Sequence, residues 1–197
     1  MRLQETSIFF QKNRYRHFYC CQYLPLCSGI DNVSRSLLKF KRGAQPDLDS
    51  WIDRALRGFL ETPVILPPDT VIIRALRHKE TRPQTDPPSS LDRLGQALSH
   101  QLGAPYRPHL LYKTHPTAVA QSLTRQQRTA ELQNVYQINP IEANAAETPP
   151  AVTNTPPSIL LLDDILTTGA TILSILQTLT AAFPNCRITI FTLAKTQ

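Results

Sequence analysis

Two adjacent carboxylates and the hydroxyl-rich turn that follows them are the residues of this sequence best suited to bind a ligand. The carboxylates belong to Asp163 and Asp164, and the turn consists of Thr167, Thr168, Gly169, Ala170 and Thr171. Ionised carboxylates accept hydrogen bonds, so the pair suits the two hydroxyls of a sugar diol or a hydrated Mg²⁺ ion. The glycine and the alanine are small enough for an anion to reach their backbone amides, and the threonines add hydroxyl donors.

The segments on either side of this turn predict the elements that hold it. Residues 159–162 are all apolar, and a run of this length is typical of a strand buried on both faces. After the turn, apolar residues recur at a helical spacing, at Ile172, Ile175, Leu176, Leu179 and Phe183. A helix N-terminus carries roughly half a positive charge and attracts phosphate, and parallel sheets bind ligands at the carboxyl ends of their strands. A phosphate site and a diol site one turn apart would fit a ribose 5-phosphate.

The order of these residues resembles the phosphoribosyl-pyrophosphate (PRPP) motif of type I phosphoribosyltransferases. That motif is an apolar strand followed by Asp-Asp, two variable residues, Thr-Thr-Gly, Gly or Ala, and Thr, and residues 159–171 fill every defining position. The resemblance implies an α/β protein of the type I phosphoribosyltransferase fold: a Rossmann-like, mostly parallel sheet flanked by helices, with a small N-terminal extension and a flap. An acidic pair before an ordinary helix start is the alternative, but it leaves the ordered Thr-Thr-Gly-Ala-Thr unexplained.

The resemblance also implies a role for each motif residue. Asp163 and Asp164 would hold the ribose hydroxyls of PRPP, with Mg²⁺ bound through the substrate and no metal held by the protein alone. The 5-phosphate would be bound by Thr167, Thr168, Gly169, Ala170 and Thr171. Family members that act on 6-oxopurines place an Asp, as general base, at the position of Thr167, and a threonine hydroxyl cannot take that role at neutral pH. The acceptor is therefore unidentified, and no catalytic residue is assigned.

Along the rest of the chain, periodicity predicts the other elements of an α/β fold. We expect helices at about 33–42, 47–60 and 91–102, a first sheet strand at 71–76, a second strand at 109–114 and a last strand at 187–194. A polar helix from Thr124 to about Tyr136 would form the flap. Residues 139–158 are rich in Ala, Thr, Asn and Pro and predict a mobile surface loop. We divide the chain into an N-terminal extension, 1–45, and a phosphoribosyltransferase-like domain, 46–197.

A basic loop follows the expected first strand at its carboxyl end. In the type I family, the loop at this place contacts the pyrophosphate group of PRPP. The resemblance therefore makes Arg77, His78 and Lys79 candidates for that contact. A solvated basic loop without a ligand is the alternative.

Two further segments resemble the competence-protein ComF-like subgroup of the family, also called GntX-like. Leu38-Lys39-Phe40-Lys41 is similar to a segment that precedes the domain in that subgroup. The match to the subgroup's flap consists of Gln121, Leu123, Arg128 and Tyr136. Glu131 stands where the flap usually carries Asn, the glutamine spacing is one residue short, and the subgroup's N-terminal zinc ribbon of four cysteines is missing.

The cysteines near the N-terminus do not predict a zinc site. Cys20, Cys21 and Cys27, with His17 nearby, contain no Cys-x-x-Cys pair, and free thiols that are buried or half-buried are the preferred interpretation. The sequence has neither a run long enough to cross a membrane nor the apolar core of a signal peptide. We therefore expect a protein of the reducing cytoplasm that has no membrane partner.

Length and charge limit the class of protein and its partners. A chain of 197 residues with a net charge of +6 has room for one good-sized domain and suits an anionic partner, either a polyphosphate or a nucleic acid. Residues 14–19 mix basic and aromatic side chains, as sites for single-stranded DNA do, but half-buried sheet edges have the same composition.

Two functions stay open at this point. The first is an enzyme that transfers phosphoribose from PRPP to an unidentified acceptor and releases pyrophosphate. The second is a non-catalytic PRPP- or nucleotide-binding accessory protein that acts with the competence machinery in DNA uptake. A homodimer is left open under both.

Overall fold

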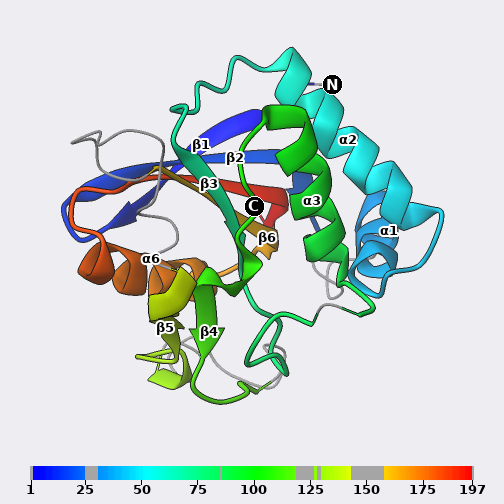
Figure 1. The fold of residues 1–197 in the computed structure, drawn as a ribbon. Coiled ribbons are helices and arrows are strands. Elements are labelled where there is room, and N and C mark those ends of the chain that lie inside the picture. The colour runs from blue at the N-terminus through cyan, green and yellow to red at the C-terminus, as the bar shows by residue number, and fades with distance from the viewer. Residues whose placement is uncertain are drawn as a thin grey trace.

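A five-stranded sheet forms the centre of the fold (Figure 1). The computed structural model describes residues 2–24, 31–84, 86–118, 127, 130–142 and 158–196. The strands of the central sheet are β1 (Gln4–Phe10), β2 (Asn13–Tyr23), β3 (Thr70–Arg74), β6 (Ser158–Leu166) and β7 (Arg187–Thr196). They lie in the order β1-β2-β7-β6-β3. β1 and β2 pair antiparallel, and the other neighbouring pairs are parallel. The expected mostly parallel sheet is confirmed.

Helices cover both faces of this sheet, so the chain is an α/β protein (Figure 1). One face carries α1 (Asn32–Lys41), α2 (Asp47–Glu61) and α3 (Ser90–Leu102). The other carries α6 (Ala170–Ala182) and a small antiparallel sheet of β4 (Leu111–Lys113) and β5 (Tyr136–Ile138), with the short 3-10 helix η2 (Pro108–Leu110) leading into β4. The helices expected at 33–42, 47–60 and 91–102 are confirmed.

The alternating side chains of β6 divide the core into two layers. Leu160 and Leu162 pack into the layer formed with α1, α2 and α3, whereas Ile159 and Leu161 pack into the layer formed with α6. All four side chains are at most 1% exposed. Each such burial contributes roughly 1.5–3 kcal/mol, so the apolar run fixes the motif strand firmly between the two helical layers.

The N-terminal residues contribute more to the sheet than their sequence indicates. The apolar residues Ile8, Phe9 and Phe10 by themselves predict only a short strand. In the structure β1 and β2 are both long, and β2 pairs in parallel with β7. Phe18 and Tyr19 are less than a tenth exposed, so neither can stack on bases from solution. Residues 14–19 are therefore part of a buried strand with solvated charges. The domain boundary at residue 45 stays a prediction, although β2 and β7 share one sheet.

Two expectations about the middle of the chain differ from the structure. The strand expected at 109–114 is present but shorter, as β4, and it pairs with β5 in a separate small sheet. The expected flap helix does not reach Tyr136, because 132–135 form a turn and Tyr136 opens β5. Leu132 and Val135 belong to the core beside α6, not to an exposed lid. Their tertiary burial outweighs the polar composition around them.

Several expectations fall outside the described residues. These are the flap residues Gln121, Leu123, Thr124 and Arg128, the thiol of Cys27, and positions 143–157 of the expected loop. The described cysteines, Cys20, Cys21 and Cys186, are all free thiols, and burial raises the pKa of Cys20 to about 12. None of the described helices is long and apolar enough to cross a lipid bilayer.

Candidate functional site

The acidic pair lies inside the motif strand and not after it. β6 extends to Leu166 because β7 continues beside it, pairing Asp163 with Thr192 and Leu166 with Lys195. The expectation that the strand ends before the carboxylates is therefore wrong. Each carboxylate also folds back on the chain: Asp163 Oδ1 accepts from the amide of Asp164 at 2.9 Å, and Asp164 Oδ1 accepts from the amide of Ile165 at 2.7 Å.

The two carboxylates face different parts of the fold. Successive residues of a strand point to opposite faces of the sheet. Asp164 Oδ2 accordingly lies 3.1 Å from the ammonium of Lys41, the last residue of α1. On the other side, burial lowers the pKa of Lys113 to about 8, and the negative charge of Asp163 is one of those that oppose the shift. Each aspartate is thus close to a lysine from a different segment.

The turn after β6 leads directly into α6. Gly169 is the N-cap of this helix, with a φ of 77°, and as a glycine it has no side chain that could cap the helix. The hydroxyl of Thr168 accepts a weak hydrogen bond from the amide of Ala170 at 3.5 Å. A helix start without a side-chain cap favours an anion there. A shallow hollow beside the turn is lined by Asp163, Ile165, Leu166, Thr167, Gly169, Ala170, Thr171 and Ile172. One carboxylate and most of the expected phosphate-binding residues therefore meet at one surface.

Alanine substitution at Gly169 separates backbone strain from ligand binding. An added Cβ would meet only Leu166 Cδ1, at 3.8 Å, so the cost comes from the left-handed φ, about 1–2 kcal/mol of unfolding free energy. We expect Gly169→Ala to lose this stability and also to weaken ribose 5-phosphate binding roughly tenfold, because the turn must distort to relieve the strain. Urea unfolding and calorimetric titration would measure the two effects.

Gly103 supplies the matched control. It ends α3 with a φ of 65° and has no atom within 4 Å of an added Cβ. Gly103→Ala is expected to lose similar stability while leaving the ribose 5-phosphate affinity as in the wild type. Equal affinities for the two variants would argue against a phosphate site at the motif turn.

The basic loop after β3 is built into the fold. The amide of Arg77 donates to Glu80 Oε2 at 2.8 Å, and its guanidinium donates to the backbone carbonyl of Lys41 at 2.7 Å and to Ser90 Oγ at 3.3 Å. Lys113 Nζ donates to the carbonyl of Arg77 at 2.9 Å. The predicted loop residue Arg77 is thus tied to α1, α3 and β4.

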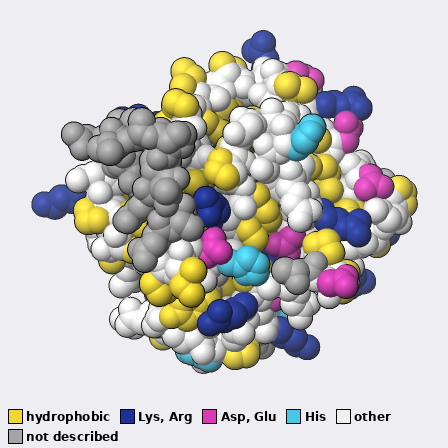
Figure 2. All heavy atoms as spheres, in the orientation of Figure 1, with side chains coloured by type: hydrophobic (Ala, Val, Ile, Leu, Met, Phe, Trp, Pro, Cys, Tyr) yellow, Lys and Arg dark blue, Asp and Glu magenta, His cyan; other side chains and the backbone are white. Residues whose placement is uncertain are grey.

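His78 reports how closely the cations of this region are grouped. Its pKa is lowered first by burial and then by the positive charges of Lys79, Lys113, Lys41 and Arg77. These cations come from three segments of the chain, and β3 and β6 are neighbouring parallel strands whose carboxyl ends share one edge. Figure 2 shows basic, acidic and histidine side chains interleaved near the centre of the drawn face instead of one continuous basic patch.

A fully buried arginine at the end of β3 holds this loop in place through ion pairs. Arg74 ends β3, is 0% exposed and forms a two-pronged ion pair with Asp92, at 2.6 Å and 3.0 Å. Its guanidinium also donates to Glu80 Oε2 at 2.7 Å, and the hydroxyl of Tyr106 donates to Asp92 Oδ1 at 2.7 Å. Burial would raise the pKa of Asp92, but the hydrogen bonds from Arg74 and Ser89 hold that pKa below its ordinary value. The network anchors the loop to the start of α3.

Sequence reasoning missed Lys41, Lys113 and the Arg74 network. The helical spacing of Val33, Leu37 and Phe40 places Lys41 on the outward face of its helix. Its side chain is half-exposed, yet its ammonium reaches Asp164. The similarity of Leu38-Lys39-Phe40-Lys41 to a known segment was a signal that could have drawn attention to it. No sequence pattern marks Lys113 or Arg74 in this way, because a charged residue at the end of a strand is normally predicted to be exposed to solvent.

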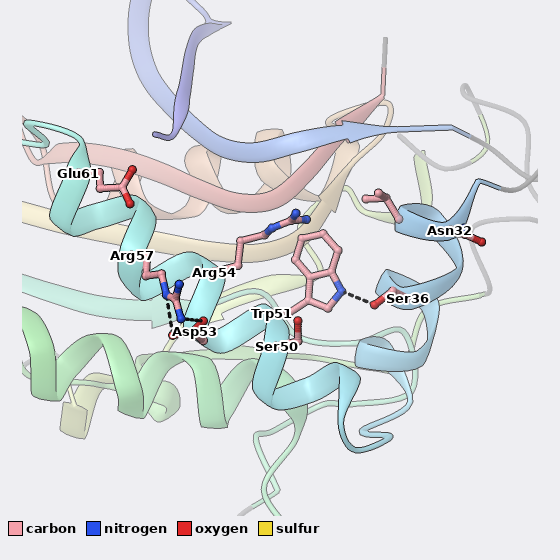
Figure 3. Close-up of a pocket in the computed structure, with 9 residues that line it drawn as sticks. Asn32, Ser36, Ser50, Trp51, Asp53, Arg54, Arg57 and Glu61 are labelled. Carbon is pink, nitrogen blue, oxygen red and sulfur yellow. Dashed lines mark hydrogen bonds and ion pairs between the residues drawn. The ribbon is translucent and has the colours of Figure 1, made fainter. Parts of the chain in front are cut away.

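A larger hollow, about 430 Å³, lies between α1 and α2 (Figure 3). Its wall includes Trp51, whose indole N–H donates to Ser36 Oγ at 3.1 Å, and Arg54, whose guanidinium lies 4.9 Å from the centre of the indole. Trp51 is only 3% exposed and belongs to the core, as its place in the apolar stripe of the helix predicts. None of the predicted site residues lines this hollow; several residues of the motif line the smaller hollow beside the turn instead.

The donor set at the motif suits Mg²⁺ only together with a substrate. Within the described ranges there is no group of three or more His, Cys, Asp or Glu side chains that could hold a metal ion. Asp163 and Asp164 are two carboxylates at this edge, and the second of them pairs with Lys41. Mg²⁺ commonly binds through one or two carboxylates plus phosphate oxygens and water, and the residues present fit that arrangement.

The fold and the site together define an α/β protein with a candidate phosphate and diol site at the carboxyl edge of a parallel sheet. No protein-family model matches the sequence, and a search of curated proteins finds no match. The structure is similar to crystal structures of adenine phosphoribosyltransferase from Leishmania tarentolae and Leishmania donovani, each with a TM-score of 0.40 and 14% identity over 88% of this chain. The match covers 82% of the first of those chains and 75% of the second. Structural similarity at this level carries no argument about function, and the functional proposal therefore rests on the site.

Proposed function

We propose that this chain is a phosphoribosyltransferase-family protein that binds PRPP with Mg²⁺ at the carboxyl edge of β6. The observation that carries the proposal is the ordered series Asp-Asp-x-x-Thr-Thr-Gly-Ala-Thr at the end of a parallel strand and the start of a helix. The cations grouped around His78 on the neighbouring strand's loop support it, because a substrate with a phosphate at one end and a pyrophosphate at the other needs two anion sites.

The proposed roles of the motif follow from the chemistry of its groups. Asp163 and Asp164 accept hydrogen bonds from the ribose hydroxyls, and the residues from Thr167 to Thr171 hold the 5-phosphate. Binding energy gained there, away from the reacting carbon, fixes the sugar for reaction. The loop residues Arg77, His78 and Lys79 face the pyrophosphate.

In the proposed reaction, the bond from the anomeric carbon to pyrophosphate breaks and a bond to the acceptor forms. The sugar passes through a state resembling an oxocarbenium ion, whose positive charge the nearby carboxylates stabilise. Mg²⁺ bound with the substrate would neutralise the charge of the departing pyrophosphate. The acceptor is unidentified, and Thr167 argues against a 6-oxopurine that depends on a carboxylate base at that position.

A non-catalytic PRPP- or nucleotide-binding accessory protein, of the ComF-like kind, is the second candidate. The observation that favours it is the hydroxyl of Thr167 where a base would stand, which leaves ligand binding intact without a group to activate the acceptor. Single-stranded DNA, the competence machinery and a second copy of this chain are the partners that this candidate brings. The free thiols of Cys20 and Cys21 support a reducing, cytoplasmic location for either candidate.

Two measurements on the full chain distinguish these candidates. Calorimetric titration with PRPP and Mg²⁺ tests binding, and release of pyrophosphate from PRPP, with a panel of purine, pyrimidine and amine acceptors, tests transfer. The enzyme proposal expects both. Binding without pyrophosphate release for any acceptor would favour the accessory protein, and absence of PRPP binding would overturn both candidates.

A further inference from the structure

Lys41 joins the motif strand to a distant part of the chain. Its ammonium lies 3.1 Å from Asp164 Oδ2. The side chain of Lys41 is 43% exposed, whereas that of Asp164 is only 11% exposed. A half-exposed cation therefore covers a nearly buried carboxylate, which would otherwise lose hydration without gaining an opposite charge.

The backbone at Lys41 is held while its side chain keeps its freedom. Ser90 Oγ donates to the carbonyl of Phe40 at 2.5 Å, and the guanidinium of Arg77 donates to the carbonyl of Lys41 at 2.7 Å. These two bonds fasten the end of α1 to the start of α3 and to the basic loop. A lysine side chain has a flexible four-carbon stem, so a fixed backbone still lets the ammonium reach more than one acceptor.

Lys41 also stands among the other cations of the edge. With Arg77, Lys79 and Lys113, it is one of four positive charges that act on His78. A pyrophosphate bound in this group would offer Lys41 an acceptor with more negative charge than one carboxylate. The hydroxyls of a ribose would at the same moment offer Asp164 new hydrogen-bond donors.

We infer that Lys41 is a movable counter-ion of this site: it pairs with Asp164 before the ligand binds and with the pyrophosphate oxygens of PRPP afterwards. The inference rests on the proposed function and deepens it by giving a residue outside the motif a role in holding the leaving group. The exchange keeps the buried carboxylate of Asp164 paired in both states. Lys41 then discriminates PRPP from ribose 5-phosphate, which has no pyrophosphate to receive it.

Three ligands test the exchange in the full chain. Calorimetric titrations with PRPP, pyrophosphate and ribose 5-phosphate, each with Mg²⁺, would be compared for the wild type and Lys41→Met. Loss of one charge-assisted hydrogen bond is expected to weaken PRPP and pyrophosphate roughly 10- to 100-fold. The affinity for ribose 5-phosphate is expected to stay as in the wild type. Lys41→Arg keeps the charge and is expected to retain most of the PRPP affinity.

Lys39→Met is the matched control. Lys39 is on the same helix, is 55% exposed and pairs with Asp47 at 3.7 Å, so the variant removes an equal charge without touching Asp164. It is expected to bind all three ligands as the wild type does. If Lys41→Met weakened the binding of all three ligands equally, the inference would be overturned, because Lys41 would then act only through Asp164. Unchanged PRPP affinity in this variant would overturn it as well. A wild type that binds none of the ligands would instead contradict the proposed function itself.

Discussion

Replacing Asp163 and Asp164 together with asparagine is expected to weaken PRPP binding by roughly two to four orders of magnitude. Each carboxylate would lose its charge and keep its shape, and a hydrogen bond to a charged group contributes about 1.5–3 kcal/mol. The double variant loses two such hydrogen bonds, one to each ribose hydroxyl, so its loss of affinity is expected to exceed that of either single variant. Calorimetric titration of the double variant with PRPP and Mg²⁺ would measure it.

The single variants and a control refine this result. Asp164→Asn also removes the partner of Lys41, so it is expected to weaken ribose 5-phosphate more than it weakens pyrophosphate. Asp53→Asn removes a carboxylate that is 56% exposed and pairs with Arg57 on α2, outside the motif. Its PRPP affinity is expected to equal that of the wild type. If the double variant binds PRPP with unchanged affinity, the assignment of the diol site to Asp163 and Asp164 is wrong.

Arg74→Met is expected to cause the largest loss of stability, about 3–5 kcal/mol of unfolding free energy, because it leaves buried carboxylates without their partner. Glu80 and Asp92 have side chains that are 10% and 5% exposed, and both lose ion pairs to the same guanidinium. A typical domain is stable by about 5–15 kcal/mol, so this change removes a large share. Urea unfolding, with circular dichroism as the probe, would measure it.

The pH dependence of unfolding separates this explanation from a simple loss of packing. In the wild type the pKa of Asp92 is held low, so its contribution to stability is present above the pKa of the unfolded state and is lost as pH falls through the folded pKa. Without Arg74, burial still raises that pKa and only the hydrogen bonds from Ser89 and Tyr106 still lower it, so the folded pKa of Asp92 rises toward that of the unfolded state or above it. Arg74→Met is therefore expected to lose less stability than the wild type does as pH falls from 5 toward 3.

Arg57 provides the stability control. It pairs with Asp53 one turn earlier on α2, and its side chain is 66% exposed. Arg57→Met is expected to change the unfolding free energy by at most about 0.5 kcal/mol, since exposed pairs of this kind contribute little. A loss for Arg74→Met as small as that for Arg57→Met would show that the buried network does not stabilise the fold.

The elements that the sequence predicts well share one property: their pattern is local. The apolar run of β6, the stripe of α2 with Trp51 and the glycine that ends α3 each depend on residues within a few turns of one another. The main sheet was expected on the same basis. Where burial depends on a distant partner, the local pattern fails. The arginines of β2 obscure a strand that pairs with β7, and the sequence does not show that β4 pairs with β5 outside the main sheet.

The candidate site divides in the same way. The acidic pair, the hydroxyl-rich turn and the helix start behind it can be recognised in the sequence, because they are contiguous and their order is the signal. The folded chain was needed to show that the two aspartates face opposite layers, that Lys41 pairs with one of them and that Arg74 holds the basic loop. Those contacts join segments far apart in the chain, and the sequence does not show which distant residue a charged side chain pairs with. The physical reason is that pairing a charge requires proximity in space, which local periodicity does not encode.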